Sequence, residues 1–399
     1  MTEIVAAKRR RFRFTAYLFT VACCNLVLIF QAAPKLRSGY QDFVIYYGAG
    51  RNILEGRAHL LYNLANQYRT QLTFANVPIR QEALPYNHPP FEAVFFVPLA
   101  LLRFWPAYVV WTALNLAMLA AIVILLRRYP SIRNIGPGLG AAAVLAFFPL
   151  INGLLQGQDV ILLLFLAVMA LVCLEHNADA MAGACLGAGL YRPHIAVPLM
   201  LLLAVRRWRI VLGFIPVGLL LLVVTVAVTG WEGPLTYVRF VFFVEKLRVG
   251  NFGPHVVPNL RGLAGSLLGH FPKPVIEISI LASSIAVLAA AARRIRKGQD
   301  SLVYIFCLAC VTTLLVCFHA LSYDLTLLLP FVLFLLGAAL KKNGGRHQVV
   351  TNLLLFILFL TPLYIYLNFE WSQFFWFAFV ILWLYFRLLA MPAPVVEPA

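Results

Sequence analysis

Short polar motifs, set between long apolar runs, hold the residues of this chain that could do chemistry. Asp42 follows the first apolar run by a few residues and precedes an amphipathic stretch over 43–54. Its carboxylate is therefore placed to remove a proton from a substrate at the membrane interface. Aspartate is also a good residue to cap the start of a helix, so capping of the 43–54 stretch is the alternative role.

Two further motifs carry side chains that could bind a polar ligand. In Tyr86-Asn87-His88-Pro89-Pro90 the prolines predict the start of the next helix, and His88 is either a binding residue or an interfacial histidine in a turn. The loop 152–159 links two apolar runs and contains Gln156 and Gln158. Amide side chains suit sugar hydroxyls, although polar residues that only cap helices are the alternative in such loops.

A break in the apolar stretch 178–204 places two basic side chains at membrane depth. The break reads Tyr191-Arg192-Pro193-His194 and predicts a hairpin of two short helices. Ionisable groups at this depth are costly, which makes them functional candidates. Because a guanidinium matches phosphate oxygens, Arg192 and His194 are candidates for binding an anionic lipid headgroup. The alternative is an ion pair of Arg192 with one of three aspartates, Asp42, Asp159 or Asp324.

The turn 318–324 and the loop 230–273 add the last candidates. The turn holds three polar side chains, His319, Tyr323 and Asp324. Asp324 could cap a helix, but His319 is harder to explain in that way. In the loop, Asn259 lies among glycines and prolines and gives a weaker signal.

The composition predicts a membrane protein. Of 399 residues, 62% are hydrophobic and 12% are charged, whereas soluble domains are about half apolar and a quarter charged. The formal net charge of +17 comes from short basic clusters rather than from a basic face with aromatic platforms, so no nucleic-acid partner is expected. The seven cysteines lie inside apolar runs, which argues against a disulfide framework. No metal-ligand spacing, P-loop or Gly-x-Ser-x-Gly motif occurs, and no metal site is expected.

The basic clusters also predict the topology. By the positive-inside rule, Arg387 and five clusters are expected in the cytoplasm, at 8–13, 127–133, 206–209, 293–297 and 341–346. The result is an all-α polytopic protein of one domain, 1–399, with about 12 transmembrane helices and both termini in the cytoplasm. Two long outer loops follow, 34–104, with amphipathic juxtamembrane helices, and 230–273. The run 14–33 is expected to be an uncleaved signal anchor, and 88–102 a juxtamembrane or re-entrant helix.

Together these features form a pattern: an aspartate after the first helix, a long first outer loop, a Pro-Pro element and polar clusters on the outer side. The residues that carry it are Gly39-Tyr40-Gln41-Asp42-Phe43, Tyr86-Asn87-His88-Pro89-Pro90, Gln156-Gly157-Gln158, Gly183 to Gly189 before Arg192-Pro193, Pro258-Asn259-Leu260-Arg261-Gly262, and His319 to Asp324 before Leu327-Leu328-Leu329-Pro330. This pattern resembles the GT-C superfamily of integral membrane glycosyltransferases. It is most similar to glycosyltransferase family 87, the polyprenyl-phosphate-mannose-dependent mannosyltransferases.

The resemblance implies a GT-C-like fold and a glycosyl transfer with inversion at the outer face of the cell membrane. Asp42 would be the general base that deprotonates an acceptor hydroxyl, on a lipid or a glycan. The donor would be a polyprenyl-phosphate sugar, with mannose as the sugar. Its phosphate would bind Arg192, His194 and His319, whose charge could replace a metal, so no cofactor is expected. Sugar and acceptor would contact six side chains, His88, Gln156, Gln158, Asn259, Tyr323 and Asp324.

Two other functions fit the same residues. A transporter or flippase of lipid-linked sugars would use buried cations to move a headgroup across the membrane, but its charges should continue toward the cytoplasmic side. Here they gather on one side, which favours an enzyme. A ligase that transfers a whole glycan from its lipid carrier shares the outer-face geometry, and only the product distinguishes it.

Overall fold

The structure is a computed structural model that describes residues 2–37, 39, 41–75, 84–247, 253–297, 300–341 and 346–390. Within these ranges the chain forms helices and turns and no strand, which confirms the all-α class. Tyr40 of the first sequence motif and part of the basic cluster 341–346 lie outside the described residues.

The helices follow one another with short connections. The first half of the chain contains α1 (Thr2–Arg37), α2 (Phe43–Leu54), η1 (Ala58–Leu60), α3 (Leu64–Leu72), α4 (Pro90–Phe95), α5 (Val97–Ala100), α6 (Phe104–Leu126), α7 (Pro130–Arg133), α8 (Pro137–Ala146), α9 (Phe148–Gln156), α10 (Val160–Glu175), α11 (Asp179–Ala188), η2 (Gly189–Tyr191) and α12 (Pro193–Ala204). The second half contains η3 (Trp208–Ile210), α13 (Val211–Thr229), α14 (Gly233–Leu247), η5 (Pro254–Val256), α15 (Leu260–Leu267), α16 (Lys273–Lys297), α17 (Leu302–Val316), η6 (Ser322–Leu328), α18 (Leu329–Lys341), α19 (Arg346–Phe359), α20 (Thr361–Ile365), η7 (Tyr366–Glu370), η8 (Phe374–Phe377) and α21 (Ala378–Ala390).

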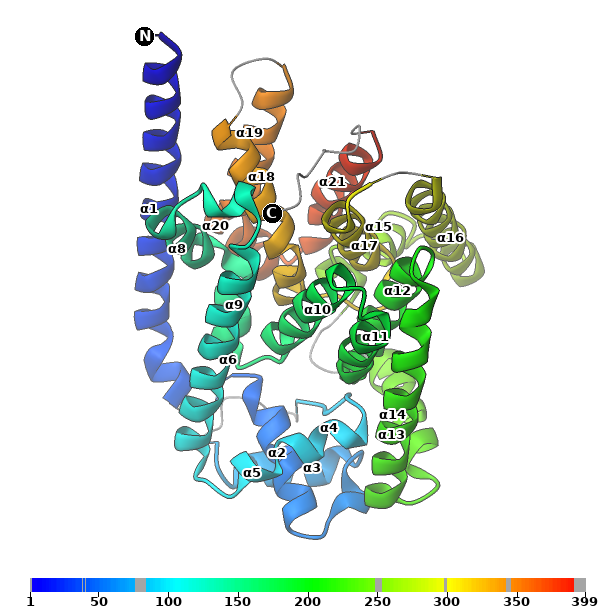
Figure 1. Cartoon of the computed structure of the whole chain (residues 1–399). Coiled ribbons are helices and arrows are strands. Elements are labelled where there is room, and N and C mark those ends of the chain that lie inside the picture. The colour runs from blue at the N-terminus through cyan, green and yellow to red at the C-terminus, as the bar shows by residue number, and fades with distance from the viewer. Residues whose placement is uncertain are drawn as a thin grey trace.

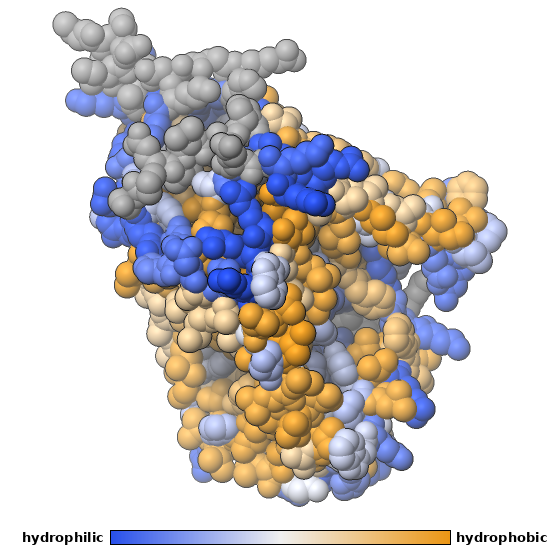
Figure 2. Space-filling view, turned by 45° about the vertical axis from the view of Figure 1, so that its right-hand side comes forward, coloured by the Kyte–Doolittle hydropathy of each residue, from blue (hydrophilic) through white to orange (hydrophobic). Residues whose placement is uncertain are grey.

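Long apolar helices make this a multi-pass membrane protein. In the described part of the chain, five helices are long and apolar enough to cross a membrane, or up to seven if each of two bent pairs is one span. Such helices satisfy their own backbone hydrogen bonds, as lipid requires. Figure 2 shows that hydrophobic residues cover much of the flank of the molecule, while hydrophilic residues gather toward its ends. The apolar surface that water would penalise is therefore available to lipid.

Bends explain why the count of long helices differs from the expected number of about 12 spans. The α8 and α9 axes meet at 64° around Phe147, and Pro149 lies in the first turn of α9. A second bend of 55° separates α19 from α20, where Pro362 follows Thr361. Proline removes a backbone donor and favours such breaks. Four further apolar helices have only 10–17 residues, namely Val160–Glu175, Pro193–Ala204, Leu302–Val316 and Phe374–Ala390.

The first loop forms a separate layer at the end of the molecule opposite the start of α1 (Figure 1). Helices α2 to α5 make this loop layer, as expected for juxtamembrane helices in 34–104. The predicted element at 88–102 is a pair of short helices, α4 and α5, which both pack against α2. An aromatic cluster fills the contact between the layer and α6, made by Phe43, Tyr46, Tyr47, Phe96, Phe104, Tyr108 and Trp111.

The predicted break in 178–204 is present. The helix α11 ends at Ala188, η2 covers Gly189–Tyr191, and α12 begins at Pro193. Glycines allow α11 to lie directly against α13. A Cβ atom at Gly183 would lie 1.8 Å from the carbonyl oxygen of Ile210, so the two backbones touch at this point.

Replacing Gly183 by Ala is expected to destabilise the protein, because the added methyl group has no space and the helices must separate. Overpacking of this kind costs about 1–3 kcal/mol and should lower the thermal unfolding midpoint measured in detergent. Gly140→Ala is the matched control, since nothing lies within 4 Å of a Cβ at that position of α8. Equal midpoints for the two variants would contradict the close contact of α11 with α13.

Candidate active site

Asp42 lies directly before α2 but does not cap that helix. It occupies the N-cap position in an α-helical conformation, and its side chain makes no capping hydrogen bond. Instead, its Oδ2 accepts a hydrogen bond of 2.8 Å from Nε2 of Gln158. Its backbone N–H donates to Oε1 of Gln156 at 3.1 Å. The capping alternative is therefore wrong, and the carboxylate is directed toward the turn between α9 and α10.

Gln158 links three functional candidates. While its Nε2 donates to Asp42, its Oε1 accepts from the Tyr46 hydroxyl at 2.6 Å and from the Arg192 guanidinium at 2.7 Å. Since Arg192 and Tyr46 both donate, Oε1 is the acceptor and the amide orientation is determined. The contacts fix the Nε2 group that faces Asp42.

The turn that carries Gln158 depends on Gly157. This glycine ends α9 in the left-handed conformation at φ +64°, which side chains disfavour. A Cβ there would also approach the Cβ of Phe43 to 2.8 Å. The indole of Trp111 donates to the Gly157 carbonyl at 2.9 Å, so α6 supports the turn from behind. The sequence Gln156-Gly157-Gln158 thus directs both glutamines toward Asp42.

Arg192, between η2 and α12, is paired within the protein. Its Nε and Nη2 atoms lie 2.6 Å from Oδ1 of Asp159, and Nη1 lies 2.5 Å from Oδ1 of Asp324. The side chains are nearly inaccessible, at 5%, 1% and 0% exposure. Asp324 also accepts the backbone N–H of Leu321 at 2.7 Å, which is the expected capping role. The ion-pair alternative for Arg192 is therefore present, with two of the three aspartates.

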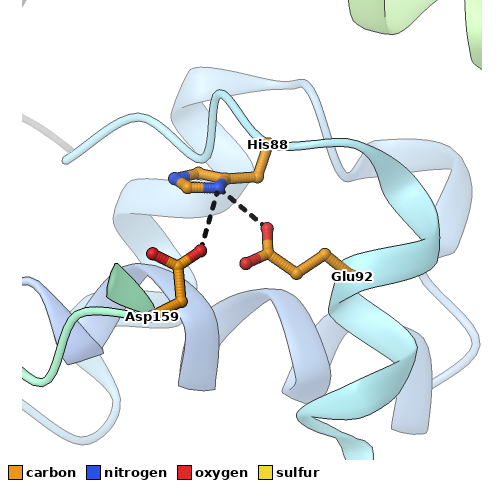
Figure 3. Close-up of side chains that lie close together, drawn as sticks. All are labelled: His88, Glu92 and Asp159. Atoms are coloured by element: carbon orange, nitrogen blue, oxygen red, sulfur yellow. Dashed lines mark ion pairs between the residues drawn. The ribbon is translucent and has the colours of Figure 1, made fainter. Parts of the chain in front are cut away.

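A second polar cluster adjoins this ion pair, made by His88, Glu92 and Asp159 (Figure 3). Nδ1 of His88 lies 2.8 Å from Oε2 of Glu92 and 3.9 Å from Oδ2 of Asp159. Burial lowers the pKa of His88 to about 4. Burial also raises the pKa of Glu92 well above its usual range, and Asp159 adds to that shift. At neutral pH, without a bound cation, both groups are uncharged. For Asp159 burial acts in the same direction, but Arg192 and His88 outweigh it and lower the pKa.

His194 and His319 lie near Arg192, as their mutual electrostatic effects show. Burial lowers the pKa of His319 to about 4, and Arg261 lowers it further. Nε2 of His194 is buried and has no hydrogen-bond partner among the described residues. An unsatisfied buried polar atom is costly and suggests that a ligand completes it.

The remaining predicted residues divide into two groups. The ring of Tyr323 faces the guanidinium of Arg192 at 5.6 Å, so Tyr323 belongs to the site. The structure uses both ends of the Asn259 amide elsewhere: Oδ1 caps α15 by accepting from Gly262, and Nδ2 donates to the Cys317 carbonyl at 2.7 Å. Asn259 thus joins the second loop to the turn that carries His319.

The sequence analysis missed Glu92. It lies in the apolar stretch 88–102, where a single carboxylate is itself a signal, and it follows His88 by four residues. Residues four apart meet on one face of a helix, so this spacing could have revealed the pair. The proximity of Asp159, 67 positions later in the chain, could not have been read from spacing.

Changing Gln158 to Glu is expected to move the acid side of the pH–rate profile to higher pH, because a carboxylate beside Asp42 favours the protonated form of Asp42. Gln158→Ala should lower the rate constant by about 10- to 100-fold, since it removes a hydrogen bond to a charged group. Steady-state rates across pH measure both effects. Asn152→Ala is the control, because its Nδ2 donates to Ser322 instead. A Gln158→Glu profile that matches the wild type would exclude this role.

The fold and the site define a polytopic helical membrane protein whose polar side chains converge where a helical loop layer meets the membrane helices. Comparison with protein families then identifies it. The model of glycosyltransferase family 87 matches residues 86–318, which is more than half of the chain. The chain therefore belongs to glycosyltransferase family 87, and the resemblance seen in the sequence motifs is confirmed. No curated protein and no solved structure matches the chain.

Proposed function

We propose that this glycosyltransferase transfers a sugar from a polyprenyl-phosphate donor to an acceptor hydroxyl, with inversion, and that Asp42 is the general base. The observation that carries the proposal is the carboxylate of Asp42, partly exposed and oriented by Gln158 rather than used as a helix cap. A carboxylate held in this way can accept the proton of a hydroxyl as that hydroxyl attacks the anomeric carbon. The donor sugar is mannose, and the acceptor is a lipid or glycan.

The donor phosphate leaves as the bond to the anomeric carbon breaks. We assign its binding to His194 and His319, supported by the unsatisfied Nε2 of His194. A neutral imidazole can donate one hydrogen bond to a phosphate oxygen. Because the guanidinium of Arg192 already contacts Gln158, Asp159 and Asp324, its role here is to position those groups and to contribute positive potential. The transfer step in this proposal uses no metal ion at the phosphate.

The sugar and acceptor would lie between the loop layer and the turn 318–324. Gln156, Tyr323 and His88 border this region and offer groups suited to hydroxyls. We place the site at the outer face of the cell membrane, with both termini in the cytoplasm. The proposal is supported by the basic cluster 8–13 at the start of α1, since α1 carries the chain from that cluster to the loop layer (Figure 1).

Product analysis tests the function. Purified protein is incubated with polyprenyl-phosphate mannose and a membrane lipid extract, and the products are examined by mass spectrometry. A gain of one hexose on an acceptor, with release of polyprenyl phosphate, is the expected result. Transfer of a larger glycan would establish a ligase, and movement of the donor across vesicles with no new bond would establish a flippase. Either outcome would refute the proposal.

A further inference from the structure

Glu92 and Asp159 have oxygen atoms that no described residue satisfies. Both oxygens of Glu92 and Oδ2 of Asp159 are buried and lack a hydrogen-bond partner in the described part of the chain. The residues are 2% and 1% exposed, so water does not reach them freely. Buried carboxylates without partners are among the most costly groups in a protein. The arrangement therefore suggests a ligand that is itself positively charged.

The spacing of the ligand atoms fits a metal ion. One ligand atom from each of His88, Glu92 and Asp159 lies within 4.8 Å of the other two. Metal bonds to histidine nitrogen and carboxylate oxygen measure about 2.0–2.2 Å, which places the ligands of a tetrahedral ion about 3.4 Å apart. The two distances from His88 Nδ1, 2.8 and 3.9 Å, lie on either side of this value. Small side-chain shifts would complete the geometry.

The charge balance of the site also favours a divalent cation. Three carboxylates are buried here, those of Glu92, Asp159 and Asp324, and Arg192 is the guanidinium that pairs with two of them. With all four groups ionised their net charge is −2, from three negative charges and one positive. A divalent ion would bring this total to zero. Arg192 contacts Oδ1 of Asp159, so Oδ2 stays available on the side of His88.

From these observations we propose that His88, Glu92 and Asp159 bind one divalent transition-metal ion of the Zn²⁺ or Mn²⁺ type. One nitrogen and two carboxylate ligands suit these ions better than Ca²⁺, which takes six to eight oxygen ligands. His88 gives access, because its side chain is 13% exposed. The two carboxylates lie behind it.

The ion has a structural role in this proposal. His88 and Glu92 belong to the start of α4 in the loop layer, whereas Asp159 belongs to the turn between α9 and α10 (Figure 3). A metal bond across that boundary would fix the loop layer to the turn that carries Gln158. Loss of the ion would therefore lower the thermal stability first.

Metal binding by the full-length protein tests the proposal. Purified protein in detergent is stripped with a chelator, incubated with Zn²⁺ or Mn²⁺ and desalted, and the bound metal is counted by mass spectrometry. One equivalent per chain and a higher unfolding midpoint are expected for the wild type. Glu92→Gln keeps the shape of the side chain and should weaken binding by about tenfold or more, as should His88→Ala.

Glu55→Gln is the matched control, because Glu55 lies in the same loop layer and pairs with Arg51 and Arg57 instead. It should bind one equivalent like the wild type. Failure of the wild-type protein to retain metal would overturn the proposal, and the carboxyl of Glu92 would then carry a proton instead. Equal retention by wild type and Glu92→Gln would show adventitious binding elsewhere and would also overturn it. Neither result depends on which sugar the enzyme transfers.

Discussion

Replacing Asp42 by Asn is expected to reduce the rate of sugar transfer by about 10²–10⁴-fold, the usual contribution of a general base. The amide has the same shape but cannot take a proton from the acceptor. Because Asp42 does not cap α2, the variant should fold normally and bind the donor with unchanged affinity. Initial rates and donor binding, measured separately on purified protein, separate the chemical step from recognition.

Asp179→Asn is the control for this experiment. Asp179 begins α11, and its carboxylate lies 3.6 Å from Arg207, so the substitution removes the same charge from a different place. Its transfer rate should remain close to that of the wild type. Wild-type turnover by the Asp42→Asn protein would mean that another group accepts the proton.

Removal of the Arg192 side chain should destabilise the protein severely. Arg192→Ala leaves Asp159 and Asp324 buried without their cation, and breaking a buried pair in this way costs about 3–5 kcal/mol. The variant is expected to unfold at a much lower temperature or to fail to accumulate in the membrane. Thermal unfolding in detergent provides the measurement.

Two further proteins interpret that result. Arg209→Ala removes an exposed arginine and should leave the unfolding midpoint unchanged. Arg192→Met combined with Asp159→Asn and Asp324→Asn removes the charges together and should recover much of the lost stability. If Arg192→Ala instead melted like the wild type and lost donor affinity, Arg192 would be a phosphate-binding residue rather than a positioning residue.

Much of the fold could be predicted because apolar runs and their breaks are local properties of the sequence. The run 14–33 lies within α1, 105–126 matches α6, and the break at 191–194 separates η2 from α12. The number of spans was harder to predict, because Pro149 and Pro362 bend two runs. A hydropathy pattern reports which residues are apolar but not how a helix bends.

The candidate site was predictable in its membership but less so in its contacts. Asp42, Gln158, Arg192 and Asp324 were all named from their residue types. Which of them pair was left open, since a guanidinium serves phosphate and carboxylate equally well. Glu92 was missed because its partner Asp159 comes from a distant helix turn.

The bond between Arg192 and Asp324 also bears on how the protein is made. These residues are 132 positions apart, and α13 to α17 lie between them. During synthesis the cation at position 192 therefore enters the membrane long before its second partner emerges from the ribosome. The nascent chain must tolerate this arginine with only Asp159 nearby, and the site can assume its final geometry only when the segment beyond α17 has been inserted.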